Sequence, residues 1–447
     1  MNTQSDYDFF GKESISKILL KVSPPVMLAQ LIQALYNIVD SFFVGRYSAD
    51  ALTAVTVIYP MQLIIIALAV GTGVGVNTYM ARKYAQHDEK SADAAAGTCA
   101  VLAFLSWAVF AAVAAVIMPR YVSTSAKEPG AVAQAITYGN IVCIGSLGTF
   151  LEGTWSKVHQ AKGNMLLPMI AQIAGALINV IFDPLLIFGI GFFPKLGAAG
   201  AAYATIFGQF TAAVIVGIKG FRIPPRIAQM PHYVKRIYLY GYSSIFMQAL
   251  YTVYIVGLNV TLASFSDSAV TVLGLYYKAQ SFFFIPLFGL ETCIVPVISY
   301  NYTAKSYDRC RETMRISFMA SLLFMILGVI CFVIFPKPLI RLFSTSEQVM
   351  EIGRIAFPII GSSFLPAVFS LMLPVFFQAI GKGIPSMFMS LMRQIFLLLP
   401  VFKLLSKIGL NYTWFAFPIA EVVSGAIGMM LYFSCIRKWQ QESNLII

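Results

Sequence analysis

Five acidic residues interrupt long apolar stretches of the sequence and could do chemistry there: Asp40, Glu152, Asp183, Glu291 and Glu421. The other fourteen of the nineteen acidic residues fall in polar stretches. A carboxylate inside a hydrocarbon layer costs about 2.5 kcal/mol or more on insertion scales, which makes it a functional candidate. Glu152 and Glu291 lie near segment ends, where contact with interfacial water explains them equally well. Glu421, in mid-segment, stays open between a functional and a structural role.

Asp40 belongs to the stretch "QLIQALYNIVDS", which carries several other polar residues. Steps of three and four residues place them on one helical stripe, with Tyr36 beside it. The stripe consists of Gln30, Gln33, Asn37, Asp40 and Ser41. This pattern predicts a hydrated pocket around Asp40.

Asp183 lies in "INVIFDPLLIFG", where Asn179 precedes it by one helical turn and can share its face. Pro184 cannot donate a hydrogen bond to the carbonyl of Val180. We expect a bend there, with a carbonyl oxygen freed beside the carboxylate.

Two acids in apolar surroundings disfavour their charged forms through desolvation and mutual repulsion. Such a pair can carry a proton, or can hold a small cation such as Na⁺ together with amide and carbonyl oxygens. A purely structural pair would only tie helices together by hydrogen bonds. For Asp40 and Asp183 the similar predicted depth, in the outer half of the membrane, favours the functional interpretation.

The elements that position these residues are membrane helices. Of 447 residues, 58% are hydrophobic and 11% charged, and the mean hydropathy is +0.77, which excludes a soluble globule. Backbone polar groups in lipid need internal partners, so the apolar segments should be helices. Twelve are expected, at about 16–44, 51–81, 94–118, 131–157, 165–191, 198–218, 237–264, 269–300, 314–336, 352–378, 385–408 and 411–436.

The basic residues predict the orientation. With the N-terminus inside, twenty of the 31 Lys and Arg residues lie on the inner side, nine outside and two, Lys278 and Arg393, within spans. Both termini then face the cytoplasm. The net charge of +12 is thus a topology signal, and no soluble basic module for nucleic acid is present. Lys278 and Arg393 could pair with acids or extend to the membrane surface.

An internal repeat divides the chain. "QALY" at 33–36 recurs at 248–251, and an offset of 218 then relates Ala51 to Ala269, Gly71 to Gly289 and "QAKG" at 160–163 to "QAIG" at 378–381. The domains are therefore 1–218, a cytoplasmic linker 219–236, and 237–447. Six helices in each half give parallel repeats, two bundles related by a pseudo-two-fold axis along the membrane normal. This arrangement favours alternating-access transport over a channel or receptor.

Two further patterns have simple interpretations. "GTGVGVN" at 71–77 looks like a nucleotide loop, but Gly71 and Gly75 in mid-membrane favour a close approach of helices. His87, His159 and His232 fall at inner loops without metal-ligand spacing and are expected to be hydrated.

Three stretches resemble the multidrug and toxic compound extrusion (MATE) family. They are "PPVMLAQLIQALYNIVDSFFVGRYSADALTAV", "INVIFDPLLIFGIGFFPKLGAAGAAYAT" and "QAKGN". The resemblance covers essentially the whole chain. It implies a V-shaped pair of six-helix bundles that exports organic molecules in exchange for H⁺ or Na⁺.

The same resemblance assigns the cation site to Asp40, Asn179 and Asp183, with Tyr36 and Tyr138 as neighbours. In some members a hydroxyl from the sixth helix also contributes, and "GAAYAT" offers either Tyr203 or Thr205. Some members have further acids on helices seven and ten. Here helix seven has none, and helix ten has only Glu351 at its entrance, so the expected coupling falls on the first lobe.

The sequence thus predicts a cation-coupled antiporter for cationic or amphipathic organic compounds, with Asn37, Pro184 and Thr205 supporting the cation site. Gln33 and Glu421 are candidates for the substrate cavity. A flippase for lipid-linked sugars or lipids is the alternative. The Asp pair is the only candidate catalytic group for an intramembrane enzyme, so no enzyme is expected. We expect a multi-pass monomer in the lipid bilayer of the cell membrane, with no cofactor, no nucleic-acid partner and no metal beyond a transient Na⁺.

Overall fold

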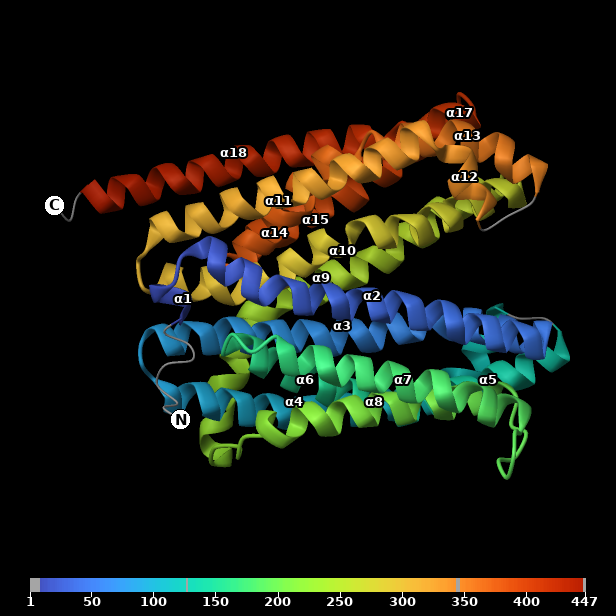
Figure 1. Ribbon diagram of the computed structural model, residues 1–447, viewed down its shortest axis with the longest axis horizontal. Coiled ribbons are helices and arrows are strands. Elements are labelled where there is room, and N and C mark those ends of the chain that lie inside the picture. The colour runs from blue at the N-terminus through green and yellow to red at the C-terminus, as the bar shows by residue number, and fades with distance from the viewer. Residues whose placement is uncertain (1–8, 126–127, 343–345, 445–447) are drawn as a thin grey trace. The chain divides into compact units, whose positions relative to one another are not determined.

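The computed structural model describes residues 9–125, 128–342 and 346–444, and within them every regular element is a helix (Figure 1). The first half contains α1 (Phe9–Lys12), α2 (Ile15–Tyr47), α3 (Ala49–Ala85), α4 (Glu89–Ser125), α5 (Pro129–Gly145), α6 (Leu147–Ala161), α7 (Leu166–Phe188) and α8 (Ala198–Gly220). The helical fold satisfies the backbone polar groups within each segment, as lipid requires.

The second half begins with the short η1 (Ile227–Gln229) and repeats the pattern. It contains α9 (Met230–Ala263), α10 (Asp267–Thr303), α11 (Tyr307–Ile334), α12 (Pro336–Arg341), α13 (Glu347–Gly361), α14 (Phe364–Ala379), α15 (Gly383–Leu391), the π-helix η2 (Met392–Leu398), α16 (Leu399–Ser406), α17 (Leu410–Thr413) and α18 (Ala416–Asn444).

The predicted membrane architecture is confirmed. Eleven helical segments in the described part of the chain are long and apolar enough to span a bilayer, and α13 with α14 forms a twelfth that is bent by 56°. The fourth span is likewise built from two helices, α5 and α6, which meet at Ser146. Both broken spans occupy the fourth position of their half.

The repeat also governs local geometry. Helices α3 and α10 both have 37 residues, and their bounds differ by 218 at each end. Ser48 and Ser266 cap them identically, each accepting a hydrogen bond from the amide three residues ahead. After these helices His87 and Lys305 both adopt a positive φ, 55° and 57°, and they too are 218 residues apart. The duplication is therefore preserved in the turns as well as in the spans.

The described residues form two compact units: residues 9–12 with Leu20–Gln248, and Glu13–Leu19 with residues 249–444. In the first unit Ile58, Met118 and Tyr138 belong to one buried core. In the second, Phe332 stacks on Phe357 at 5.0 Å and meets Phe364 edge-on at 4.8 Å. Each unit therefore has its own interior.

Glycines bring α3 against the first half of α9 in the first unit. A Cβ atom on Gly75 would lie 2.2 Å from the carbonyl oxygen of Ile237, and one on Gly71 would lie 2.8 Å from the amide nitrogen of Ile245. Gly241 of α9 makes the matching contact, since a Cβ atom there would lie 2.6 Å from the carbonyl oxygen of Gly71. The sequence prediction that Gly71 and Gly75 allow close helix packing is confirmed.

Replacing Gly75 with alanine should destabilise the protein by about 1 to 3 kcal/mol, because the new methyl group must displace the backbone of α9. Gly274 in α10 is the matched control, since a Cβ atom there meets nothing within 4 Å. We expect Gly274→Ala to be neutral or slightly stabilising. Thermal unfolding of the two detergent-purified variants checks this, and equal unfolding midpoints would contradict the packing role of Gly75.

Candidate functional site

Asp183 is fully buried in α7, and close packing against α8 fixes its helix. A Cβ atom on Gly175 would lie 2.7 Å from the carbonyl oxygen of Gly208, and one on Gly208 would lie 2.5 Å from that of Gly175. Nearer Asp183, a Cβ atom on Gly200 would lie 2.5 Å from the carbonyl of Leu186. Because these three glycines let the backbones touch, polar side chains of α7 and α8 can reach each other.

Helix α2 runs beside α7 and brings Asp40 to Asp183. The Nε2 atom of Gln172 donates to Oε1 of Gln33 at 3.0 Å, and the rings of Phe43 and Phe188 lie 6.5 Å apart. These contacts come in the same order along both helices, so the helices are parallel. Between them the two aspartates lie close enough for their carboxyl groups to interact directly.

The oxygens of this site lack donors. Among the described residues, Oδ1 of Asp40, both carboxyl oxygens of Asp183 and Oδ1 of Asn179 are buried without a hydrogen-bond partner. The Nδ2 atom of Asn179 points the other way, toward Oγ1 of Thr205 at 3.4 Å. Buried acceptors without donors are costly, and oxygens are what protons and hard cations bind. The site is therefore suited to a small cation.

Thr205, and not Tyr203, supplies the hydroxyl from α8. Tyr203 is 40% exposed, whereas Thr205 contacts Asn179. The sequence alone left this choice open because both residues lie in the same stretch. The side chain that touches α7 is decided by the rotation of α8 about its axis, which the Gly208 contact fixes.

Two tyrosines border the acids. Tyr138 of α5 is buried, and its hydroxyl accepts a hydrogen bond from Nε2 of Gln62 in α3 at 3.4 Å. Tyr36 and Tyr138 both lie within electrostatic range of Asp40 and Asp183. Gln62 is not among the site residues expected from the sequence, although its recurrence as Gln280 in the repeat is a usable signal.

Other expected site residues have more varied positions. Gln33 is engaged with Gln172, as described above. Pro184 lies within α7, which continues without a break to Phe188. Glu152 of α6 accepts a hydrogen bond from the hydroxyl of Ser156 at 2.8 Å, one turn along its own helix. The side chain of Asn37 lies outside the described ones.

In the second unit, Glu421 has a basic partner. Nη1 of Arg393 in η2 donates to Oε1 of Glu421 at 2.7 Å, and the two side chains are 11% and 9% exposed. The hydroxyl of Ser370 in α14 donates to the other carboxylate oxygen. Of the two possibilities left open for Arg393, pairing with an acid is the one that the structure shows. Lys278 is exposed.

His159 and Glu291 also carry buried polar atoms. His159 was expected to be hydrated, and this was wrong: it is 4% exposed, and its Nε2 lies 2.9 Å from the carbonyl oxygen of Val216. The end of α6 packs against α8, which removes the imidazole from solvent. Oε1 of Glu291 is buried and has no hydrogen-bond partner among the described residues, and Arg393 is a nearby positive charge.

The chain is similar to a known family and to several known proteins. The family described as MatE matches residues 25–185 and 243–402. A "FAD transporter" of Shewanella oneidensis is 26% identical, covering 92% of this chain and 93% of its own. A "Probable multidrug resistance protein NorM" of Thermotoga maritima is 25% identical, covering 98% and 97%. A solved MOP superfamily transporter from Pyrococcus furiosus has the same fold, with a TM-score of 0.91 at 20% identity over 98% of this chain and 100% of that one.

The Arg393 and Glu421 pair should behave as a coupled unit in stability measurements. Arg393→Gln alone should cost about 3 to 5 kcal/mol, because it leaves a buried carboxylate without its cation. The double variant Arg393→Gln with Glu421→Gln should recover most of that loss. As a control, Lys17→Gln removes a partner of Glu13 from an ion pair of 2.8 Å whose side chains are 68% and 40% exposed, and it should change little. Additive effects in a double-mutant cycle would refute the coupling.

Proposed function

Because the chain belongs to the MatE family, we propose that it is a cation-coupled antiporter that exports cationic or amphipathic organic compounds by alternating access. The observation that carries the coupling proposal is the set of four donor-free oxygens on Asp40, Asn179 and Asp183. Two carboxyl groups that interact directly cannot both stay ionised without a compensating cation. Binding of H⁺ or Na⁺ is therefore strongly linked to the local packing of α2 and α7.

The coupling ion would act through this packing. When the site is open to the outside, H⁺ or Na⁺ neutralises the aspartates, α2 repacks against α7, and the organic substrate is released. When the site opens inward, the ion leaves, the acids repel each other again, and new substrate enters. The energetic requirement is that the ion binds the two conformations with different affinities.

A proton and Na⁺ would use the site differently. A proton can be shared between Asp40 and Asp183 alone, whereas Na⁺ needs further oxygens such as those of Asn179 and Thr205. In this cycle the protein acts as a monomer in the cell membrane. Both of its termini face the cytoplasm. No resident cofactor is needed, because the ion gradient supplies the energy.

The substrate class rests on charge. In the second unit, Glu421 already balances Arg393, so this guanidinium is not free to bind a diphosphate. A flippase for lipid-linked sugars, the alternative, would require such a free cation for its pyrophosphate. The relative from Shewanella oneidensis carries the name of an FAD transporter, so a flavin dinucleotide belongs in any substrate screen beside organic cations.

Loss of either aspartate should abolish coupled export. In vesicles with an imposed pH or Na⁺ gradient, Asp40→Asn and Asp183→Asn should each reduce drug export at least tenfold, because the exchangeable charge is lost. Asp50→Asn, which changes an acid in the first turn of α3, is the control and should retain normal rates. Export at the wild-type rate by both site variants would refute the proposed coupling role.

A second pair of variants separates the two ions. Asn179→Ala and Thr205→Val remove oxygens that only a metal cation needs, and they keep both carboxyl groups. If Na⁺ is the coupling ion, we expect these variants to raise the Na⁺ concentration for half-maximal export at least fivefold. If H⁺ is the coupling ion, the proton-driven rate should stay within twofold of wild type. Loss of export under both gradients would show that the amide and hydroxyl have another role.

A further inference from the structure

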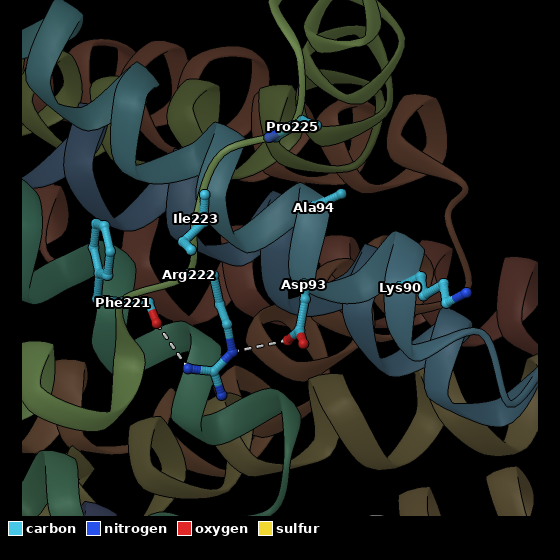
Figure 2. A pocket seen from close by; sticks show the side chains of 7 residues that line it. All are labelled: Lys90, Asp93, Ala94, Phe221, Arg222, Ile223 and Pro225. Carbon is cyan, nitrogen blue, oxygen red and sulfur yellow. Dashed lines mark hydrogen bonds and ion pairs between the residues drawn. The ribbon is translucent and has the colours of Figure 1, made fainter.

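A pocket of about 450 Å³ lies where the segment after α8 crosses the start of α4. Figure 2 shows its lining, in which Lys90, Asp93 and Ala94 come from α4 and Phe221, Arg222 and Ile223 come from the segment after α8. All of these residues belong to the first compact unit. The pocket is remote in sequence from the aspartates, and the proposed transport cycle does not use it.

The wall formed by residues 221–225 is held in place. A Cβ atom on Gly97 of α4 would lie 2.6 Å from the carbonyl oxygen of Ile223 and 2.7 Å from Cα of Pro224, so the two backbones are in contact. Nε of Arg222 donates to Oδ1 of Asp93 at 2.9 Å, and its Nη1 donates to the carbonyl oxygens of Lys219 and Phe221. This wall of the pocket is therefore a fixed part of the fold.

The charge of the pocket is positive. Asp93 is the one acid in the lining, and it is shared by Arg222 and by Lys162, whose Nζ lies 3.9 Å away. Lys90 is exposed and makes no ion pair with any described residue. In Figure 2 it extends on the side of Asp93 away from Arg222. Three cations thus surround one carboxylate, and residues 219–236 contain no acid at all.

Large apolar side chains beside these cations are exposed. The exposed fractions are 76% for Ile218, 54% for Phe221, 82% for Ile223 and 83% for Ile227. Alternation of such residues with Lys219, Arg222 and Arg226 is typical of a segment that lies in the headgroup region of a bilayer. The apolar side chains then reach acyl chains while the cations meet headgroups.

The pocket is not a product of the duplication. At the positions 218 residues after Lys90, Asp93 and Gly97, the second half has Asp308, Arg311 and Arg315. Asp308 and Arg311 pair with each other on α11. The second half thus has an acid in place of the unpaired lysine and a large side chain in place of the glycine.

We propose that this pocket binds one anionic phospholipid, with Lys90 as the main partner of its phosphate, Arg222 adding positive charge from the other side of Asp93, and its acyl chains along Phe221 and Ile223. Charge complementarity selects the headgroup, because an uncharged or zwitterionic lipid leaves the excess of positive charge unbalanced. The apolar side chains distinguish a lipid from a soluble phosphate compound, since only a lipid covers them. Lipid binding at the segment that follows α8 would hold it against α4.

Titration of the detergent-purified full chain with phosphatidylglycerol and with phosphatidylcholine, followed by native mass spectrometry, tests the proposal. Wild-type protein should bind the anionic lipid at least fivefold more tightly. Lys90→Gln should weaken that binding about fivefold, the equivalent of one cation near an anionic headgroup. Ile223→Ser should also weaken it.

Matched controls change residues of the same kind outside the pocket. Lys235→Gln removes an exposed lysine of the acid-free stretch 219–236, and Ile384→Ser removes an isoleucine of α15 that is 71% exposed. Both should bind phosphatidylglycerol within twofold of wild type. Because Lys90 and Ile223 are exposed, we expect their variants to fold normally. Unfolding midpoints equal to that of wild type, measured without lipid, check this.

Three outcomes would overturn the proposal. The first is equal affinity for the two lipids, and the second is equal weakening by Lys90→Gln and Lys235→Gln. The third is displacement of phosphatidylglycerol by millimolar inorganic phosphate with no effect of Ile223→Ser, which would identify a site for soluble anions. None of these measurements depends on the transport cycle, so they are independent of the proposed function.

Discussion

Contact between helix backbones at glycine is the constraint on which the rest of this structure depends. Lipid tails are as apolar as the side chains, so helices in a bilayer associate through close packing and polar contacts. Gly75 against Ile237 joins α3 to α9, and Gly175 against Gly208 joins α7 to α8. The second contact brings Asn179 to Thr205, and it fixes the helix that presents Asp183. Glycines, which have no side chain, thus set the helix positions that bring the buried oxygens of the site together.

The two repeats use one scaffold for different electrostatics. In the first, Asp40 and Asp183 face each other, and their buried oxygens have no donors among the described residues. In the second, Glu421 receives hydrogen bonds from Arg393 and Ser370. Ser370 stands 218 residues after Glu152, so an acid of the first repeat corresponds to a neutral donor in the second. Glu421 is thus balanced by a fixed cation, whereas the buried oxygens of Asp40 and Asp183 are left without a donor.

Fold and substrate are separate questions in this family. The chain has a TM-score of 0.91 with a solved transporter at 20% identity, so packing positions preserve the fold while most side chains differ. Relatives of nearly equal similarity carry the names of an FAD transporter and of a multidrug resistance protein. The architecture therefore does not identify the substrate, which depends on local charges such as the balanced Arg393.

The sequence by itself determined the twelve spans, the repeat and the close packing at Gly71 and Gly75, because hydropathy, periodicity and self-similarity are local or linear signals. It also identified Asp40 and Asp183 as unusual, since a charge in an apolar run is visible without a structure. Only the tertiary structure decided which side chains meet: Thr205 over Tyr203, Glu421 with Arg393, and His159 buried against α8. Those outcomes depend on the rotation of each helix about its axis and on the π-helical turn at η2, which small differences in packing set and no single stretch of sequence encodes.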